Sequence, residues 1–190
     1  IKTLLKVNGK CAGVVPDNVL FEGGAGEIIR KKLLEQCDLH TMLRLPTGIF
    51  YAGGVKANVL FFDKKPARED GKAWTEKLWI YDLRTNMHFT QKEKKLTRAD
   101  LDEFVKCYNA ADITKRKEDT TDEKTRWKSY TYEKIVTFDK TSLDIFWLKD
   151  DSLIDLENLP EPDVIAQEIS DNLESALESV TELIENLKNK

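Results

Sequence analysis

The sequence has few residues of the kinds that build metal sites, disulfide frameworks or membrane spans. Only two histidines, His40 and His88, and three cysteines occur among 190 residues. The cysteines are widely spaced and odd in number, and neither histidine has a partner at ligand spacing. We therefore expect no metal site and a reduced, cytoplasmic protein. No apolar run approaches the roughly 20 residues that a bilayer span requires, so no membrane association is expected.

Nucleophilic chemistry and an acidic catalytic pair also lack support. The sequence contains no G-x-S-x-G motif and no plausible Cys/His couple. Adjacent carboxylates such as Asp150-Asp151 lie in polar runs, which is typical of solvated surface. The glycines of FEGGAGE, residues 21–27, precede a helix but lack the third glycine of a dinucleotide fingerprint, so we interpret them as a structural turn.

Charge is distributed unevenly along the chain. Residues 1–65 carry a net charge of +4 and residues 66–149 carry +2, whereas residues 150–190 carry −10, with twelve acidic side chains against two lysines. A strongly acidic tail repels nucleic acid. Any nucleic-acid surface is therefore expected within the first 149 residues.

Short β-rich segments alternate with helical patterns in the first part of the chain. Strands are predicted over 10–15, 39–45, 58–63 and 77–83, and helices over 25–37 and 97–109, an order that indicates an α/β sheet. The charged segment 64–75, with Pro66 and Gly71, predicts an exposed, mobile loop. We expect three parts, which are an α/β part over 1–109, an irregular connecting region with short strands or helices over 110–160, and a long helix over 161–190 that Pro162 opens.

The stretch LRLPTGIFYAGGVKANVLFF, residues 43–62, joins two of these strands through an unusual loop. A plain turn needs a glycine or an asparagine, whereas this loop carries Phe50, Tyr51, the pair Gly53-Gly54 and Lys56. An aromatic ring on such a loop can stack on a nucleobase, a contact worth about 1–3 kcal/mol, and a lysine can meet a phosphate. The alternative is that the rings only cover one end of the sheet, and the residues alone favour neither.

Apolar residues in the tail alternate at spacings of four and three, the pattern of a coiled-coil seam. The narrow stripe and the acidic flanks favour a helical partner with basic flanking positions, and the alternative is that the helix folds back on its own domain. The predicted interface residues are Ile169, Leu173, Ala176, Val180, Leu183 and Leu187.

Several separate strings carry a family resemblance. VVPDNVLFEGGAGEIIRKKLLEQCDLHTMLRLPTGIFYAGGVKANVLFF, LWIYDLRTN, LTRADLDEFVKCY and SLDIFWLKDDSL resemble the modification subunit of type I restriction–modification systems. That family comprises adenine-N6 DNA methyltransferases that use S-adenosylmethionine. The resemblance runs over nearly the whole chain but covers only the family's carboxyl-terminal portion. It implies the carboxyl-terminal half of a Rossmann-like methyltransferase sheet, followed by a helical C-terminal extension.

The resemblance also implies roles for particular residues. Phe50 matches the aromatic residue that stacks on a flipped-out adenine, with Tyr51 as the alternative ring. We expect Lys56 and Arg44 to contact the DNA backbone. The tail would bind the specificity subunit, and a restriction subunit would supply cleavage.

Two family motifs are absent from this chain, namely the glycine-rich cofactor motif and the Asn-Pro-Pro-aromatic tetrapeptide. The first residue is Ile1 rather than methionine, so we expect a piece of a longer enzyme that neither binds S-adenosylmethionine nor methylates DNA alone. It would have no catalytic or cofactor-binding residue of its own. The alternatives to a DNA methyltransferase are a non-enzymatic interaction module and a methyltransferase that acts on RNA or protein.

Overall fold

The computed structural model describes residues 1–149, apart from 51–53, 88, 91–93 and 119–123, together with eight residues of the tail. Those eight residues are 166, 169, 170, 173, 176, 177, 180 and 181. The chain divides into two compact units, Ile1–Lys149 and Asp150–Lys190, and each is described by itself.

One mixed sheet organises the first unit. Across the sheet its described strands follow the order β1 (Lys10–Pro16), β3 (Ala57–Lys64), β2 (Cys37–Arg44), β4 (Lys77–Asp82) and β5 (Trp127–Thr131). β2 and β4 are parallel, and every other neighbouring pair is antiparallel. The four strands predicted from the sequence are thus present, with ends that differ from the predicted ones by at most two residues.

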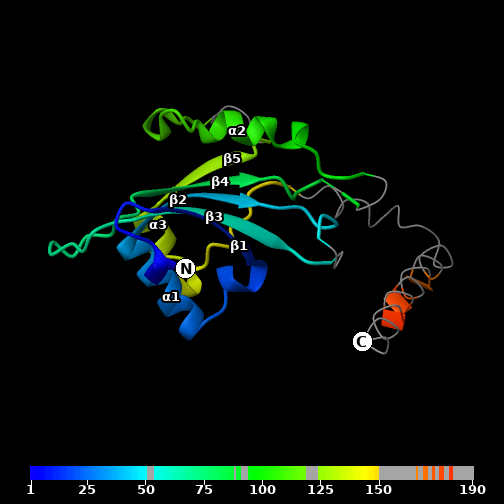
Figure 1. The fold of residues 1–190 in the computed structure, drawn as a ribbon, viewed down its shortest axis with the longest axis horizontal. Coiled ribbons are helices and arrows are strands. Elements are labelled where there is room, and N and C mark those ends of the chain that lie inside the picture. The colour runs from blue at the N-terminus through cyan, green and yellow to red at the C-terminus, as the bar shows by residue number, and fades with distance from the viewer. Residues whose placement is uncertain are drawn as a thin grey trace. The chain divides into compact units, whose positions relative to one another are not determined.

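The direction of the strands decides which loops meet. β1 and β2 are both antiparallel to β3, so they run the same way, and β4 runs with them. Helix α1 (Ala25–Gln36) connects β1 to β2 across the face of the sheet. In Figure 1 the loop between β2 and β3, drawn in cyan, lies at the end toward which the arrows of β2 and β4 point, and the loop after β3 extends from the opposite end.

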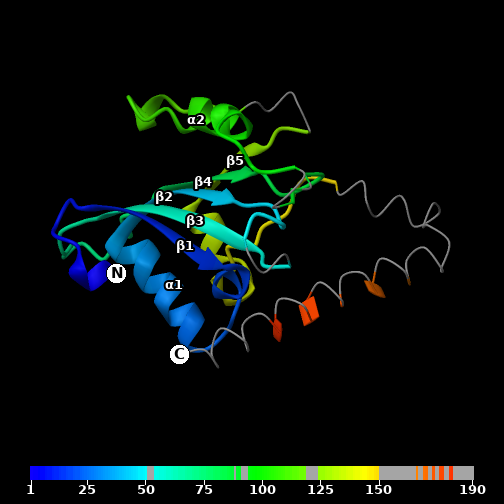
Figure 2. The same ribbon diagram turned by 45° about the vertical axis from the view of Figure 1, so that its right-hand side comes forward.

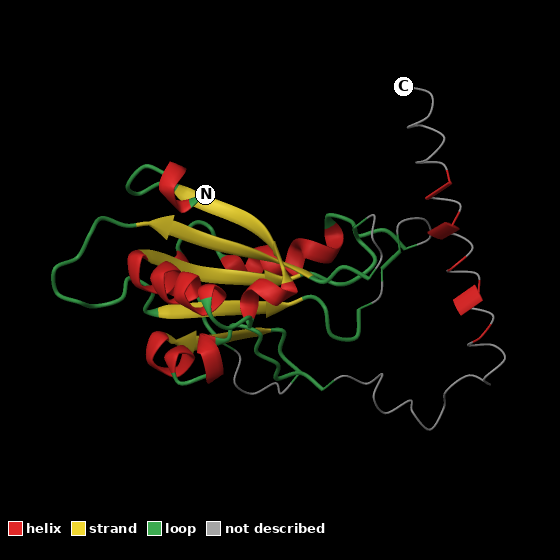
Figure 3. Ribbon diagram, turned by 90° about the horizontal axis from the view of Figure 1, so that it is seen from below, coloured by secondary structure: helices red, strands yellow, loops and turns green. Residues whose placement is uncertain are grey.

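Helices cover both faces of the sheet. Helices α1 and α3 (Tyr132–Val136) lie on one face and α2 (Asp102–Tyr108) on the other, as Figures 1 and 2 both show. Seen from below in Figure 3, the helices of the first face lie in front of the strands. The α1 face and the α2 face therefore each need an apolar layer.

Alternation along the strands supplies these two apolar layers. Leu78 and Ile80 of β4 point to the α1 face, whereas Trp79 and Tyr81 point to the α2 face, as the period of two in a strand requires. The buried core on the α1 face consists of Leu20, Leu34, Cys37, Leu39, Met42, Leu60, Phe62, Leu78, Ile80, Ile135 and Leu143. The buried core on the α2 face consists of Leu43, Leu45, Ala57, Trp79, Tyr81, Leu83, Phe104 and Trp127.

A buried arginine fills the turn before α1. The Arg30 guanidinium donates to the carbonyls of Val19, Glu22, Lys140 and Thr141 at 2.7–3.1 Å. A Cβ added at Gly26 would lie 3.2 Å from Arg30 Nη1. The space that a phosphate would need is thus occupied by the protein's own cation, which fits the interpretation of FEGGAGE as a structural turn.

The structure divides the chain differently from the three predicted parts. Residues 127–131 form β5, which pairs with β4 in the same sheet, so the compact unit continues past residue 109 to Lys149. The helix predicted over 97–109 is shorter, with a 3-10 turn at Ala99–Leu101 followed by α2. In the tail, each of the eight described residues is helical.

Candidate functional site

The carboxyl ends of β1, β2 and β4 and the start of β3 share one edge of the sheet, called the carboxyl edge below. In open α/β sheets ligands bind outside the carboxyl ends of the strands. The residues at these ends are polar, in contrast to the apolar strands that lead to them. They are Asp17 after β1, Arg44 at the end of β2, Asn58 in β3, Asp82 at the end of β4, and Arg84 just beyond it.

An ion pair between Asp17 and Arg84 lies at the centre of this edge. The two Nη atoms of Arg84 donate to the two carboxylate oxygens of Asp17 at 3.0 and 2.9 Å. Asn58 Nδ2 donates to the same carboxylate at 2.9 Å. Because the side chains are only 11% and 19% exposed, water screens this pair less than it screens a surface pair. The bidentate geometry joins the ends of β1, β3 and β4.

Arg84 also holds both stems of the loop over residues 46–56, called the 46–56 loop. Its Nε donates to the Leu45 carbonyl at 3.2 Å and its Nη2 to the Ala57 carbonyl at 3.3 Å. The Leu45 amide donates to the Ala57 carbonyl at 3.0 Å, and the Asp17 amide donates to the Lys56 carbonyl at 3.1 Å. The ends of the loop are therefore fixed to the same ion pair.

A glycine lets the 46–56 loop lie against the next loop. Gly48 has a φ of +81°, and a Cβ there would lie 1.8 Å from the carbonyl oxygen of Phe89. Such a contact is impossible without a backbone shift, so any other residue at position 48 would move the loop. Phe89, which follows β4, is itself buried.

Phe50 is half-buried, and with Ile49 it packs against the core on the α2 face. Lys56, at the other end of the loop, is exposed. Tyr51 and Gly53 lie outside the described residues. The structure therefore places one predicted ring between the loop and the core, with part of its surface accessible.

Arg44 does not fit the predicted role of a DNA-backbone contact. Its side chain is fully buried, and its Nη2 lies 2.5 Å from Asp144 Oδ1. The same guanidinium donates to the Ile145 carbonyl at 2.5 Å and lies 4.1 Å from the centroid of the Phe146 ring. A cation enclosed by these partners has no surface for a phosphate, and it instead joins β2 to the segment after α3.

The sequence prediction missed Asp17, Asn58 and Arg84. Each is a polar residue next to an apolar strand, which was the available signal. The signal that was missing is the order and direction of the strands in the sheet, because these residues meet only when β1 and β4 end, and β3 begins, at the same edge.

Electrostatics at the carboxyl edge favour the charged form of Asp17. Burial alone raises the pKa of a carboxyl group. The hydrogen bonds from Arg84 and Asn58, together with the positive charge of Arg84, outweigh burial and hold the pKa of Asp17 below its ordinary value. Asp17 and Arg84 therefore remain a charged pair in the folded protein at neutral pH.

In the tail, the described residues of the predicted interface are Ile169, Leu173, Ala176 and Val180, and all four are exposed. Leu173 has 66% and Val180 51% of its surface accessible. Leu183 and Leu187 lie outside the described residues.

The described part of the chain lacks both a cluster of metal ligands and a membrane-spanning helix. It contains no group of three or more His, Cys, Asp or Glu side chains that could hold a metal ion. No helix within it is long and apolar enough to cross a membrane. The three cysteines, all of them described, are free.

Comparison with known proteins gives the family. The family model for N-6 DNA methylases matches residues 1–148, which is more than half of the chain. The chain belongs to the N-6 DNA methylase family. Curated relatives include the type I restriction enzyme StySPI methylase subunit of Salmonella potsdam, which is 42% identical over 208 residues. The EcoKI methylase subunit of Escherichia coli strain K12 is 42% identical over 210 residues.

Both comparisons cover 96% of this chain but only 39% of the relative. This N-6 DNA methylase chain thus spans about two-fifths of the length of the curated relatives it matches. Among solved structures, the crystal structure of the type I restriction enzyme EcoKI M protein matches with a TM-score of 0.69 and 38% identity, over 98% of this chain and 42% of that one. The resemblance to type I modification subunits is confirmed, as is a mixed α/β fold.

The Asp17–Arg84 pair predicts a specific pH dependence of stability. A carboxyl group whose pKa is lowered by folding stabilises the protein fully above its unfolded pKa of about 4, and this stabilisation is lost as the pH falls through the folded value. We expect the unfolding free energy of the wild type to fall more steeply below pH 4 than that of Asp17→Asn. Urea denaturation between pH 2.5 and 6 measures both slopes.

Asp139→Asn is the matched control, since this aspartate is 88% exposed and takes no part in the carboxyl edge. It should keep the wild-type slope. Equal slopes for Asp17→Asn and Asp139→Asn would contradict the prediction.

Proposed function

We propose that this chain is the carboxyl-terminal portion of an adenine-N6 DNA methyltransferase, the modification subunit of a type I restriction–modification system. The parent enzyme transfers a methyl group from S-adenosylmethionine to an adenine flipped out of the duplex, and it works in the cytoplasm. The identity of 42% with two type I methylase subunits, over nearly the whole of this chain, supports the proposal most strongly.

The proposed contribution of this chain to the reaction is to hold the flipped base. Extruding a base costs a few kcal/mol of lost stacking and pairing, and an aromatic platform offsets part of that cost. The proposal is supported by the position of Phe50 on a loop whose two stems are bonded to Arg84. Lys56, exposed on the same loop, would meet a phosphate beside the flipped nucleotide.

The described residues do not fit a site for S-adenosylmethionine. At the carboxyl edge, the carboxylate of Asp17 is occupied by Arg84 and Asn58. The glycine turn before α1 is filled by the Arg30 guanidinium. We therefore propose that residues outside this chain hold the cofactor and the target amino group, and that residues 1–190 alone are inactive.

We also propose that the sheet of the parent is Rossmann-like and continues beyond β1. Among the described strands, β1 has a partner only on its β3 side. An edge strand offers a row of unpaired backbone groups to a further strand. Val14, on this strand, has 60% of its surface accessible.

The proposed partners are DNA, a specificity subunit and a restriction subunit. The tail is assigned to the specificity subunit because its apolar stripe is exposed and flanked by acidic residues. A relative with a solved structure, 25% identical with a TM-score of 0.58, comes from a study of complex assembly in a type I R-M system.

The role of Phe50 is tested in the full-length enzyme assembled with its subunits. We expect Phe50→Ala to weaken the extrahelical state by about 1–3 kcal/mol, the range for one base–aromatic stack, while cofactor affinity hardly changes. The fluorescence of 2-aminopurine at the target position reports flipping, and single-turnover methylation reports the rate.

Ile49→Ala is the matched control, because Ile49 packs on the same core and carries no ring. It should leave the 2-aminopurine signal near that of the wild type. An unchanged signal in Phe50→Ala together with a loss in Tyr51→Ala would mean that the neighbouring ring holds the base.

The interface in the tail is tested by one charge placed either within the predicted apolar stripe or outside it. Leu173→Asp introduces a carboxylate into the apolar stripe and should weaken binding of the specificity subunit at least about tenfold, since a buried unpaired charge is costly. Thr181→Asp introduces the same charge at a polar position outside the predicted stripe and should have little effect. Calorimetric titration of the full-length subunit measures both affinities.

The melting temperature of each variant distinguishes a helix that binds the specificity subunit from a helix that packs on its own domain. If Leu173→Asp leaves partner binding intact but unfolds the sheet, the helix belongs to its own domain and the interface proposal fails.

A further inference from the structure

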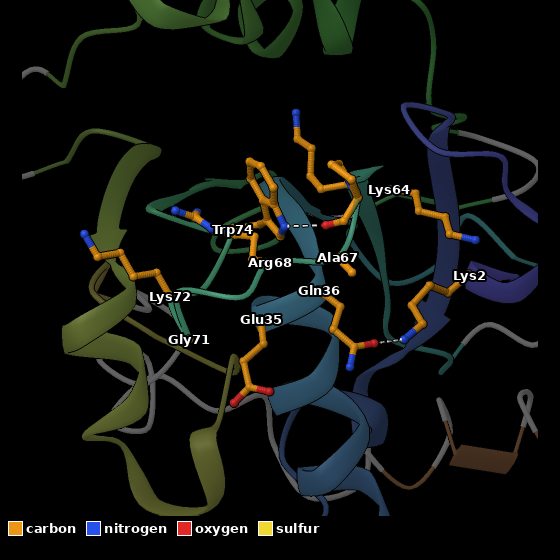
Figure 4. Close-up of a pocket in the computed structure, with 11 residues that line it drawn as sticks. Lys2, Glu35, Gln36, Lys64, Ala67, Arg68, Gly71, Lys72 and Trp74 are labelled. Carbon is orange, nitrogen blue, oxygen red and sulfur yellow. Dashed lines mark hydrogen bonds between the residues drawn. The ribbon is translucent and has the colours of Figure 1, made fainter.

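A second charged site lies at the edge of the sheet opposite the carboxyl edge. There the end of β3, the loop over residues 65–76 and the last turn of α1 enclose a pocket of about 480 Å³, called the Trp74 pocket. Its volume falls within the ~300–1,000 Å³ typical of ligand sites. Figure 4 shows its lining side chains, which come from the 3-10 turn at the amino terminus, from α1, and from β3 and the loop after it.

The lining of the Trp74 pocket is strongly positive. Glu35 is its single carboxylate, and its cationic residues are Lys2, Lys64, Lys65, Arg68 and Lys72. Like charges gathered in one concavity repel each other, and they also focus a positive potential on whatever enters. An anion in the pocket would relieve that repulsion.

Three of these cations have no carboxylate partner among the described residues. Lys64 Nζ donates to the Leu5 carbonyl at 2.6 Å, and Lys2 Nζ donates to the side-chain oxygen of Gln36. Both acceptors are neutral, so neither ammonium group is hydrogen-bonded to a described carboxylate. Lys72 is exposed at the rim, and no ion pair joins it to a described residue.

The wall of the pocket is tied to the rest of the fold. The Trp74 indole N–H donates to the Pro66 carbonyl at 2.9 Å, which closes the loop on itself. Arg68 lies 4.4 Å from the ring centroid of Trp74 and donates two hydrogen bonds to Asp70. The loop predicted to be mobile thus has an internal framework that holds its cations around one aromatic ring.

The same loop removes an obstacle to anion binding at the end of α1. The last carbonyls of a helix carry partial negative charge, which disfavours an anion there. The amides of Trp74 and Thr75 donate to the carbonyls of Glu35 and Leu34, both at 3.1 Å. Thr75 Oγ1 also donates to the Cys37 carbonyl at 2.8 Å. The helix end is therefore capped by the loop that brings the cations.

We propose that the Trp74 pocket binds a phosphate-bearing ligand, through Lys2, Lys64 and Lys72. Ammonium groups on flexible stems suit phosphate oxygens as compact point charges. The phosphates come from one of two sources, a small polyphosphate or the backbone of a nucleic acid. β2 has eight residues, and at about 3.3 Å per residue the pocket lies roughly 25 Å from the carboxyl edge. The site is thus separate from the 46–56 loop.

Two probes distinguish the sources. Inorganic tripolyphosphate represents the small ligand, and a short duplex of G·C pairs represents the nucleic-acid backbone. The duplex contains no adenine, so its binding does not depend on the proposed methylation or on Phe50. Calorimetry and fluorescence anisotropy at fixed salt measure the two affinities for the full 190-residue chain.

The test variant is Lys64→Gln with Lys72→Gln, and the matched control is Lys106→Gln with Lys140→Gln. The control removes two charges from exposed lysines, one on α2 and one beside Gly23 before the start of α1, whereas the pocket lies at the last turn of that helix. We expect the test variant to bind at least one probe about tenfold more weakly than the wild type, and the control to bind within about twofold. For the duplex, the slope of the logarithm of the binding constant against the logarithm of the salt concentration should become smaller in magnitude by about two. That is about one for each lost phosphate contact. Lys72→Gln alone, at the exposed rim, repeats the test if the double variant does not fold.

Each outcome decides the proposal. Loss of tripolyphosphate binding alone assigns a small polyphosphate, and loss of duplex binding assigns the nucleic-acid backbone. Absence of binding by both probes, or equal weakening in the test and control variants, overturns the site. Displacement of either probe by poly-glutamate as effectively as by tripolyphosphate would show a general surface for carboxylates and would also overturn it.

Discussion

The ion pair between Asp17 and Arg84 is the interaction on which the arrangement of the carboxyl edge depends. It joins the end of β1 to the residue after β4, and through Arg84 it reaches both stems of the 46–56 loop. A partly buried charge pair is stable only when its remaining donors and acceptors are also satisfied, and removing one partner leaves a charge without compensation. Asn58 and the carbonyls of Leu45 and Ala57 meet that requirement here.

This constraint links the fold to the proposed function. A loop that receives a flipped base needs stems that are held in place and an aromatic ring that can contact the base. Arg84 holds both stems of the loop, Gly48 lets it lie against the Phe89 backbone, and Phe50 is the ring proposed to contact the base. The carboxyl edge thus fixes both stems of the loop, whereas the cations of the Trp74 pocket lie at the other end of the same strands.

The elements of the sheet could be predicted from the sequence, because alternating apolar residues between turn signals reflect strands that are buried on their faces. The contacts of individual charged residues could not. Arg44 is the last residue of a strand, a position that a surface residue could take, yet its side chain is buried and pairs with Asp144, a hundred positions later. Asp17 and Arg84 meet because β1 and β4 run the same way and end at one edge of the sheet, which no local pattern reveals. The loop after β3 has a charged composition typical of disordered segments, but the hydrogen bond from the Trp74 indole to the Pro66 carbonyl closes it on itself.

A double-mutant cycle on Asp17→Asn and Arg84→Gln tests the central claim most directly. If the pair holds the carboxyl edge together, each single variant should lower the unfolding free energy nearly as much as the double variant does. The coupling energy should then lie at about 1–3 kcal/mol, as for residues in one buried network. Additive effects, with a coupling energy near zero, would show that Asp17 and Arg84 act independently and would contradict the account.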